Sequence, residues 1–497
     1  MKKALMTFIL IPVLLFYAYP TEAAEKEGRK WQDETVYYLM VDRFNNGDTD
    51  NDYEVDTTNM EAYQGGDFKG IIDKLDYIKD MGFTSIRLTP IFDNAENGYH
   101  GYWVKDFYKP DEHFGSMKTF KKLVKEAHKR DMKVMVDFVA NNVSTEHAWL
   151  NDTEKKGWFN PENGKGQRAW TDGLPDLDQS NPEVRNYLVD AGKWWIEESD
   201  IDGYFLDSAQ NVPADFWTDF SKEMKKTKSN IYLVEDTGGA DTKQKAGIDA
   251  SIDYKLMDPM RQAFAKPDGN LKAVVTGEDF SKEKAFNAAR ILDNQDSVRF
   301  TKDAVDQNQH PGTRWKLALS YLYTVPGVPV VYYGSEIALN GEKPPENSKL
   351  MNFKTDKDLV DYMTKIGELR NQLPSLTRGS MDVLYAKDGM AVYKRTYDNE
   401  TTVIAINNTA KSQDVTLTSK DLEKDKELRG LLSDDMVKSK DGSYKIVLDR
   451  EEAQIFVLAP KSGLNIPYLL SMAAVYAAFF VFIFILLKRA RKKKQNN

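Results

Sequence analysis

The chain has 497 residues, no cysteine and a formal net charge of −9 at pH 7. Without cysteine it has no disulfide, no thiol nucleophile and no thiolate metal site. Its basic residues cluster only near the C-terminus, so the charge pattern does not indicate nucleic-acid binding. The length suits one large domain and a smaller one.

Residues 1–24 have the pattern of a secretory signal peptide. Two lysines follow the first Met, an apolar stretch covers Ala4–Tyr17, and small residues follow at Ala23 and Ala24. We therefore expect this segment to be cleaved on export. An uncleaved anchor helix is the alternative, which the short apolar run disfavours.

The middle of the chain alternates short β-rich runs with amphipathic helical stretches such as Phe68–Met81, Met117–Arg130 and Asn186–Glu198. Eight such units predict an α/β fold, a parallel (β/α)8 TIM barrel over residues 30–376, with its active site at the carboxyl ends of the strands. An open doubly wound sheet is the rival, but no glycine-rich phosphate loop follows the first strand. The strand candidates are Val36–Val41, Thr84–Leu88, Lys133–Val139, Gly203–Asp207, Ile231–Glu235, Ala250–Tyr254, Ala289–Asp293 and Pro329–Tyr333.

Two regions depart from this alternation. Residues 142–182 are too long and irregular for a plain connection, so we expect a loop domain inserted after strand 3. After residue 376 the pattern changes to short alternating strands, which predict a C-terminal antiparallel β-sandwich over residues 377–460. Its strand candidates are Met390–Thr396, Thr402–Ile406, Gln413–Leu417, Tyr444–Leu448 and Gln454–Leu458.

Residues 466–487 are apolar and uncharged, and about 20 such residues suffice to span a bilayer. The basic tail 488–497 follows at once and is expected to stay in the cytoplasm, so the middle region faces outward. The sequence therefore predicts a single-pass protein of the cell membrane, in contact with the lipid bilayer. A buried core helix is the alternative, which the basic cluster disfavours.

Three carboxylates, Asp207, Glu235 and Asp296, stand at or just after the ends of apolar runs. An acid where a buried strand meets solvent is costly unless it is used or paired. A lone acid is usually a helix cap or half of a surface ion pair. Cleavage of a glycosidic bond, however, requires one carboxyl group as nucleophile, another as proton donor and others to hold the sugar.

Over roughly residues 33–460 the sequence resembles the α-amylase superfamily of glycoside hydrolases, nearest to maltogenic amylases, cyclodextrin glucanotransferases and fungal-type α-amylases. The resemblance implies a retaining hydrolase of α-glucans such as starch and maltooligosaccharides, and it leaves altered specificity and transglycosylation open. Asp207 would be its nucleophile, Glu235 its acid/base and Asp296 its transition-state stabiliser. The motifs that carry the resemblance are Tyr99–Trp103, Asp137–Asn141, Leu174–Asp178, Gly203–Asp207, Glu235, Asn294–Asp296 and Gly327–Gly334.

The resemblance also implies which residues hold the sugar, with Tyr102 stacking on it at the cleavage point. The implied substrate-binding set is His100, Tyr102, Trp103, Asp137, Asn142, Asn211 and Gln295. Trp158, Phe159 and Trp170 are further stacking candidates, although aromatic residues in such loops are as often simply packed.

Two calcium sites are implied as well. Residues 42–52 and 65–67 resemble a calcium loop of cyclodextrin glucanotransferases and maltogenic amylases, and hard cations prefer such oxygen ligands. An acidic surface turn is the alternative. A second ion would tie the loop domain to the barrel. The implied ligands are Asn46, Asp48, Asn51, Asp52, Gly65 (carbonyl) and Asp67 for the first Ca²⁺, and Asn141, Asp176 and Asn211 (carbonyl) for the second.

The sequence departs from the family pattern around the sugar. Asn142, Asn211 and Gln295 replace histidines, and Gln210 replaces a lysine. The amides can still donate hydrogen bonds to hydroxyl groups, as a neutral imidazole does. These exchanges therefore indicate retuning of the sugar site.

The replacement of an arginine by Phe205, two residues before Asp207, should affect catalysis more than these exchanges do. Losing a guanidinium beside the nucleophile costs on the order of 1.5–3 kcal/mol, about one to two decades in rate. Arg87, on the second predicted strand, is a candidate to restore a cation from across the barrel. A salt bridge from Arg87 to a neighbouring helix is the alternative.

These substitutions leave other functions open. A catalytically impaired glycan-binding or scaffold protein at the cell surface is the main alternative to an enzyme. A partner subunit of another membrane protein is a weaker one, based on fold analogy alone. We expect a monomer.

Overall fold

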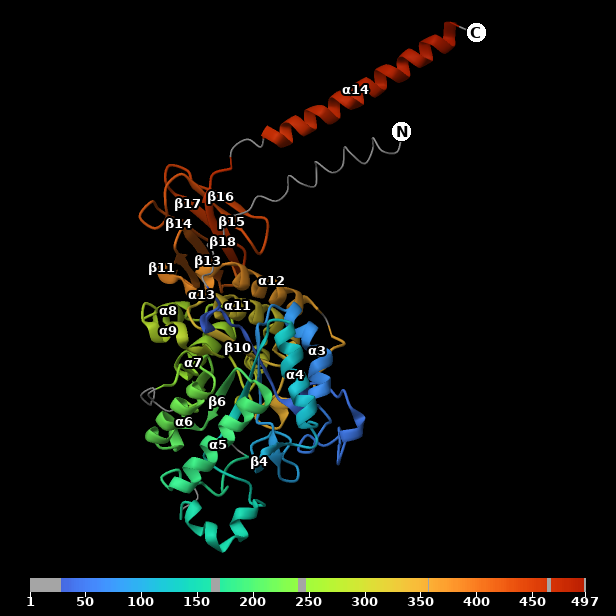
Figure 1. Cartoon of the computed structure of the whole chain (residues 1–497). Coiled ribbons are helices and arrows are strands. Elements are labelled where there is room, and N and C mark those ends of the chain that lie inside the picture. Colours follow the sequence, from blue (N-terminus) through green and yellow to red (C-terminus); the bar gives the residue numbers. More distant parts are fainter. Residues whose placement is uncertain (1–27, 162–169, 240–246, 356, 463–465, 496–497) are drawn as a thin grey trace.

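The structure is a computed structural model that describes residues 28–161, 170–239, 247–355, 357–462 and 466–495. The predicted signal peptide, residues 1–24, lies outside the described residues. Figure 1 shows a large helix-covered body, a smaller β-rich unit that follows it, and a long C-terminal helix.

An eight-stranded parallel sheet forms the centre of the large body. The strands pair in the order β8-β7-β6-β5-β2-β1-β10-β9, and an isolated bridge between Ile252 and Ala289 joins the two ends. The sheet is therefore a nearly closed (β/α)8 barrel, as predicted. Its strands are β1 (Val36–Leu39), β2 (Ser85–Leu88), β5 (Lys133–Val139), β6 (Gly203–Asp207), β7 (Tyr232–Glu235), β8 (Ala250–Ser251), β9 (Ala289–Arg290) and β10 (Val328–Tyr332).

Three of the predicted strands are at least two residues shorter than expected. The first ends at Leu39 because a short helix, α2 (Val41–Phe44), begins two residues later. The run Ala250–Tyr254 ends at Ser251 because Asp253 accepts from the amide groups of Lys255 and Leu256 and caps a helix instead. The run Ala289–Asp293 ends at Arg290.

Helices cover the outside of the barrel (Figure 1). The predicted third helix begins four residues early, because Asn181 caps its first turn and Pro182 occupies the first helical position. The helices are α3 (Phe68–Asp80), α4 (Met117–Lys129), α5 (Pro182–Ser199), α6 (Ala214–Thr227), α7 (Tyr254–Phe264), α8 (Leu271–Thr276), α9 (Glu283–Asn287), α10 (Phe300–Asp306), α11 (Pro311–Thr324), α12 (Asp358–Gln372) and α13 (Pro374–Arg378).

Two insertions extend the barrel. A hairpin of β3 (Phe92–Asn94) and β4 (Val104–Pro110) follows β2. The predicted loop domain follows β5 and contains the 3-10 helices η3 (Ala148–Asn151) and η4 (Thr153–Trp158). Trp158, a candidate for sugar stacking, is buried there against Trp149, with ring centroids 4.7 Å apart.

The chain after α13 forms two antiparallel sheets, as predicted. They enclose their own apolar core, which includes Val392, Val403 and Ile446. On the other face of the larger sheet, Tyr393 packs on the barrel and its hydroxyl lies 2.5 Å from Thr324 Oγ1. The larger sheet has the order β11 (Ser380–Lys387), β12 (Met390–Tyr397), β13 (Glu400–Asn407), β18 (Glu452–Pro460), β15 (Lys426–Gly430), β16 (Met436–Lys438), and the smaller pairs β14 (Gln413–Leu417) with β17 (Tyr444–Leu448).

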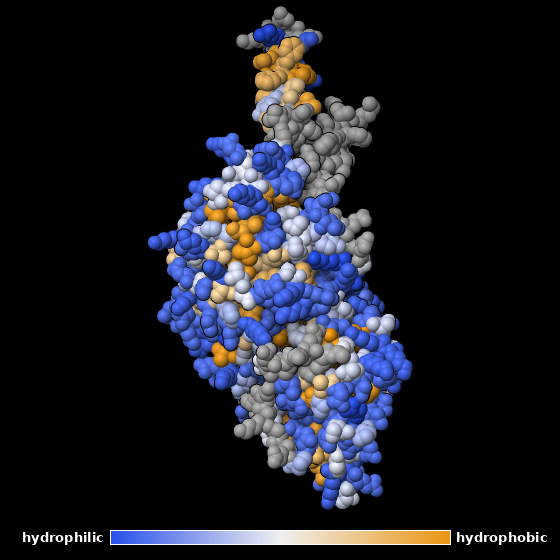
Figure 2. Space-filling view, turned by 90° about the vertical axis from the view of Figure 1, so that its left-hand side faces the viewer, coloured by the Kyte–Doolittle hydropathy of each residue, from blue (hydrophilic) through white to orange (hydrophobic). Residues whose placement is uncertain are grey.

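Helix α14 (Ile466–Gln495) projects from the β-rich unit (Figure 1). In Figure 2 its apolar segment forms a hydrophobic surface next to a largely hydrophilic body. Leu470, Phe480 and Phe484 are each about two-thirds exposed. Within the described residues, Leu470–Arg489 is long and apolar enough to cross a membrane, a criterion of length and composition alone.

Candidate active site

Asp207 and Glu235 end two neighbouring strands of the barrel. Asp207 is the last residue of β6 and Glu235 is the last of β7, with Leu206 paired to Glu235. Neighbouring parallel strands present their carboxyl ends at one edge, where (β/α)8 barrels carry their active sites. The two side chains are only 2% and 1% exposed. The fold therefore brings the predicted pair together in a shielded place.

Glu235 is oriented by the next strand. Its Oε1 accepts a hydrogen bond of 2.7 Å from Ser251 Oγ, at the end of β8. A buried carboxyl group held by a defined donor has fewer accessible rotamers, which suits a group that must deliver a proton in one direction.

Asp296 lies in the loop after β9 and is half-buried. Asn294 shapes this loop, because its Oδ1 accepts from the amide groups of Asp296 and Ser297, both at 3.1 Å. The Asp296 carboxylate accepts from Gln295 Nε2 at 2.8 Å. The third predicted acid therefore sits on a turn that its own neighbours hold in shape.

Asp137, on β5, accepts several hydrogen bonds from the protein itself. Arg87 donates to both carboxylate oxygens, from Nε at 2.6 Å and from Nη2 at 2.9 Å. Tyr102 OH donates to Asp137 Oδ2 at 3.0 Å and Tyr38 OH at 3.2 Å. With its oxygens occupied in this way, Asp137 is placed to position other groups more than to bind a sugar directly.

The Arg87 side chain points into the barrel and is 1% exposed. Its guanidinium carbon lies 3.9 Å from the ring centroid of Tyr38 and 4.0 Å from that of Phe205. Arg87 Nη2 is also 3.5 Å from Asp236 Oδ2. Its ion-pair partners lie on β5 and directly after β7, so the alternative of a salt bridge to a neighbouring helix is wrong.

The predicted stacking residue Tyr102 is completely buried. The Trp170 ring lies parallel to it, with centroids 6.1 Å apart, and parallel to His100 at 4.8 Å. The Trp170 carbonyl also accepts a hydrogen bond from Trp103 Nε1. In this conformation a sugar can stack on Tyr102 only if Trp170 moves.

Other members of the predicted sugar site surround Tyr102. His100 Nδ1 accepts from the Tyr102 amide at 3.0 Å, and Gln295 Nε2 donates to the Tyr102 hydroxyl at 3.4 Å. Asn142 Nδ2 is 3.5 Å from the Tyr102 carbonyl. Asn211, by contrast, is exposed at the end of η5 (Ala209–Asn211). The fold thus brings most of the predicted substrate-binding residues together around the Tyr102 ring.

Two glutamines have unsatisfied side-chain atoms in the part of the chain that the structure describes. Both polar side-chain atoms of Gln210 are buried without a hydrogen-bond partner, and so is Gln295 Oε1. Such groups are rare in folded proteins and indicate a place where a ligand or water completes the hydrogen bonding. These two residues occupy positions where the family pattern has Lys and His, so they fit the interpretation of a retuned sugar site.

Sequence reasoning missed the residues that support the acids. Asp236 Oδ1 accepts from Tyr254 OH at 2.9 Å, and Tyr254 OH accepts from Asn294 Nδ2 at 3.1 Å. Asp236 directly follows Glu235, so its position could have drawn notice. Ser251 and Tyr254 carry no such signal, because only the closure of the barrel brings them to the site.

The first predicted calcium site has suitable oxygen donors. Asn46 Nδ2 donates to both oxygens of Asp52, at 2.8 and 2.9 Å. Gly65 lies against them, because a Cβ on it would be 2.6 Å from Asn46 Nδ2. Asn51 Oδ1 is buried without a hydrogen-bond partner among the described residues. An unpartnered buried amide oxygen fits a calcium ligand.

Asp67, assigned to the same site, has a structural role as well. Its Oδ1 caps α3 by accepting from the Gly70 amide at 2.6 Å, and its Oδ2 accepts from the Asp48 amide at 2.8 Å. Across the described residues, three or more Asp, Glu, His or Cys side chains do not converge to hold a metal ion. A calcium ion here would therefore draw on amide and carbonyl oxygens too.

The second predicted calcium site is only partly assembled. Asn141 Nδ2 donates to Asp176 Oδ1 at 3.0 Å, and a bridge between Asn142 and Asp176 ties the loop domain to the end of β5. The structure thus joins two of the three implied ligands. Their direct hydrogen bond already provides the tie that the ion would supply.

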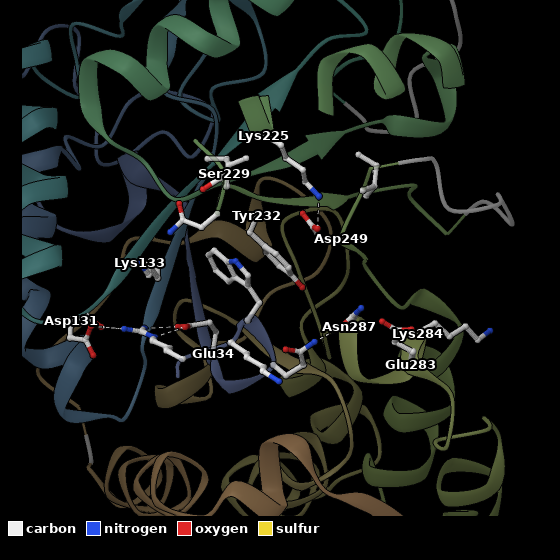
Figure 3. Close-up of a pocket in the computed structure, with 17 residues that line it drawn as sticks. Glu34, Asp131, Lys133, Lys225, Ser229, Tyr232, Asp249, Glu283, Lys284 and Asn287 are labelled. Carbon is white, nitrogen blue, oxygen red and sulfur yellow. Dashed lines mark hydrogen bonds and ion pairs between the residues drawn. The ribbon is translucent and has the colours of Figure 1, made fainter. Parts of the chain in front are cut away.

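A cavity of about 890 Å³ lies at the opposite end of the barrel, where the strands begin (Figure 3). Its charged groups largely pair with one another, as Arg29 does with Glu34 at 2.6 Å and Lys225 with Asp249 at 2.6 Å. The start of the strands is the face that stabilises such barrels. The cavity is therefore separate from the site of the acids.

Comparison with known proteins agrees with this geometry. The family model for the alpha amylase catalytic domain matches residues 38–431. The crystal structure of an Anoxybacillus alpha-amylase has a TM-score of 0.84 and 53% identity, covering 88% of this chain and 100% of that one. An alpha-amylase from Geobacillus thermoleovorans, complexed with acarbose, has a TM-score of 0.82 and 48% identity with the same coverage.

A more distant relative is the beta/alpha-amylase of Paenibacillus polymyxa, which is 31% identical over 456 residues. That match covers 86% of this chain, and the chain spans 38% of the relative's length. The chain belongs to the alpha-amylase family of glycoside hydrolases.

Proposed function

We propose that this protein is a membrane-anchored, extracellular α-glucan hydrolase that cleaves starch and maltooligosaccharides with retention of configuration. The observation that carries the proposal is the placement of Asp207 and Glu235 at the ends of adjacent strands, with Asp296 on the loop that follows β9. Family members in complex with acarbose or maltotriose support a glucan substrate.

In the proposed reaction Asp207 attacks the anomeric carbon while Glu235 protonates the departing glycosidic oxygen. Water then displaces Asp207 from the glycosyl-enzyme, and Glu235 takes the proton of that water. Ser251 holds Glu235 in line for both steps. Asp296 binds sugar hydroxyls and favours the oxocarbenium-like transition state. Transfer to a sugar instead of water would need an acceptor bound beside Glu235.

The test is turnover by the full-length protein in detergent, with an Asp207→Asn variant as the matched control. Starch, maltooligosaccharides and an activated glucoside serve as substrates. We expect reducing sugar to be released faster than by the control, and a fluorinated glycosyl trap to label Asp207. Rates equal to the control with no labelled peptide would reject the enzyme proposal.

A second candidate function is glycan binding without turnover. Phe205 at the position of an expected arginine and the cover of Trp170 over Tyr102 favour it. Binding of maltotriose measured by calorimetry, together with rates equal to those of Asp207→Asn, is the result that this function predicts.

We propose that α14 anchors the protein, with residues 1–24 removed on export and 488–497 in the cytoplasm. The support is a segment of exposed apolar side chains that water solvates poorly and a bilayer would cover. Protease added to intact cells should degrade the barrel and spare an epitope after residue 488. Recovery of the full-length chain in the soluble fraction would contradict the anchor.

We also propose that Ca²⁺ binds at Asn46, Asn51, Asp52 and Gly65, and a second ion at Asn141, Asp176 and Asn211. A ligand that binds only the folded state raises its stability. Chelation should therefore lower the melting temperature, and an Asn51→Ala variant should lose part of that response. An unchanged melting temperature on chelation would count against both sites. Light scattering tests the expected monomer.

A further inference from the structure

The Arg87 guanidinium is enclosed on four sides inside the barrel. Tyr38 and Phe205 stack on its two faces at 3.9 and 4.0 Å, and Asp137 and Asp236 lie at its edges at 2.6 and 3.5 Å. Aromatic faces attract cations most strongly when the cation has lost its water. Breaking a buried ion pair by removing one partner is strongly destabilising, because the other charge is left buried and unpaired. These contacts hold the Arg87 guanidinium in a defined position.

The position is set by the residue that replaces the expected arginine. Phe205 is on β6 two residues before Asp207, and it pairs with Asp137 of the neighbouring β5. An arginine at 205 would place a second guanidinium where Arg87 now lies. The aromatic ring of Phe205 instead offers a flat face on which the guanidinium of Arg87, from β2, stacks. The ring on β6 and the cation on β2 therefore fit each other.

An ion pair and then a series of hydrogen bonds lead from Arg87 towards the acids at the site. Asp236, which directly follows Glu235, accepts from Tyr254, and Tyr254 accepts from Asn294. Asn294 Oδ1 in turn accepts from the Asp296 amide at 3.1 Å. A polar network therefore runs from Arg87 through Asp236, the residue next to Glu235, to the backbone amide of Asp296.

We propose that Arg87 is the positioning cation of this active site, supplied from β2 in place of an arginine at position 205 and held there by stacking on Phe205. The inference rests on the proposed function for the roles of Asp207, Glu235 and Asp296. It explains how a chain with Phe205 can keep a working acid trio, and it assigns a function to an arginine outside the family motifs.

The electrostatic effect has a defined sign. A buried positive charge favours the ionised form of nearby carboxyl groups. Burial opposes the charge on Arg87, but attraction to Asp137 and its hydrogen bonds hold the pKa of Arg87 well above its usual range, so the charge persists. The titratable groups that face it are Tyr38 from β1, Asp137 from β5 and Asp236 after β7.

The test separates this role from simple neutralisation of Asp137. The Asp137→Asn protein is compared with the Arg87→Met/Asp137→Asn protein, in which no orphan carboxylate is left at 137. If Arg87 positions the catalytic acids, the double variant has a kcat at least tenfold lower than that of Asp137→Asn. The acid limb of its kcat/KM profile also moves up by about one pH unit. Equal kcat and equal profiles in the two folded proteins would overturn the proposal.

A second pair of variants covers the case in which the double variant does not fold. Arg87→Phe removes the cation, and Arg87→Phe/Phe205→Arg exchanges ring and cation between β2 and β6. We expect the exchange to recover at least tenfold in kcat over Arg87→Phe. No recovery in a folded exchange variant would overturn the proposal.

Arg370→Lys is the control. Arg370 is equally buried but donates to backbone carbonyl groups, including Gly327 O at 2.6 Å, away from the acids. Its substitution should lower the melting temperature and leave the pH profile unchanged.

Failure of the proposed function can be distinguished from failure of the Arg87 inference. Turnover of the unmodified protein against Asp207→Asn decides whether the protein is an enzyme. If it is not, the pH dependence of maltotriose binding replaces kinetics. Loss of Arg87 in the Asp137→Asn background should then shift the binding profile, and identical profiles would overturn the inference.

Discussion

Trp170 lies parallel to Tyr102, at an interplanar angle of 12° and a centroid distance of 6.1 Å. The sequence assigns both residues to sugar stacking, yet the structure stacks one on the other. The loop domain thereby closes over the residue that is expected to hold the sugar at the point of cleavage.

Trp170→Ala should therefore raise kcat/KM for long maltooligosaccharides by about threefold to tenfold, because a glucan no longer has to displace an aromatic stack. Initial rates on maltoheptaose measure the effect. Trp149→Phe, in the packed part of the loop domain, is the control and should change little. A fall in kcat/KM would mean that Trp170 itself contacts the sugar.

Ser251→Ala should lower kcat by about tenfold with little change in KM, because Glu235 loses the 2.7 Å hydrogen bond that orients it. Ser251→Thr keeps the hydroxyl and should retain most of the rate. If Ser251→Ala and Ser251→Thr are equally active, the bond does not contribute to catalysis.

Glu336→Gln should make the protein more stable at neutral pH. Glu336 is fully buried, and burial raises the pKa of its carboxyl group although Tyr37 and Tyr77 donate hydrogen bonds to it. A raised folded pKa gives stability that is full below about pH 4.3, the value in the unfolded chain, and that falls as pH rises towards the folded value.

Melting temperatures of Glu336→Gln and the unmodified protein should accordingly agree near pH 4 and differ by a few degrees at pH 8, with the variant higher. Asp358→Asn, at an exposed ion pair with Lys316, is a surface control. A lower melting temperature of Glu336→Gln at pH 8 would show that the carboxylate is needed in its charged form.

Asp202→Asn should destabilise the protein at neutral pH and less so in acid. Burial opposes the charge of Asp202, but the hydrogen bond from His128 and the charge of Lys228 outweigh it, and they lower the pKa of the carboxyl group to about 2. The stabilisation is present above about pH 4, where the unfolded group is also ionised, and is lost as pH falls through about 2.

The expected loss for Asp202→Asn is about 2 kcal/mol at pH 7, from a pKa difference of about two units. Denaturant unfolding at pH 7 and pH 3 measures it, and the gap between variant and parent should narrow at pH 3. A gap that is equal at both pH values would assign the effect to packing.

Several features could be predicted from the sequence because they depend only on residues that are close together in the chain. The bounds of β5, β6, β14 and β17 were predicted correctly, since apolar alternation and flanking turn residues define such runs. The adjacency of Asp207 and Glu235 followed as well, because consecutive strands of a parallel barrel are neighbours. The end of β8 was missed because Asp253 serves as a helix cap, a choice that depends on where the helix packs.

The sequence by itself determined the class of fold, the order of the strands and the edge at which the acids lie, because hydrophobic periodicity and chain order are properties of neighbouring residues. The tertiary structure decided the direction of Arg87, the cover of Trp170 over Tyr102 and the support of Glu235 by Ser251. Each of these joins residues far apart in the chain, so it depends on how the barrel closes and on which face of a short strand turns inward. That closure places Arg87 against Phe205 and so determines which residue supplies a positive charge to the site.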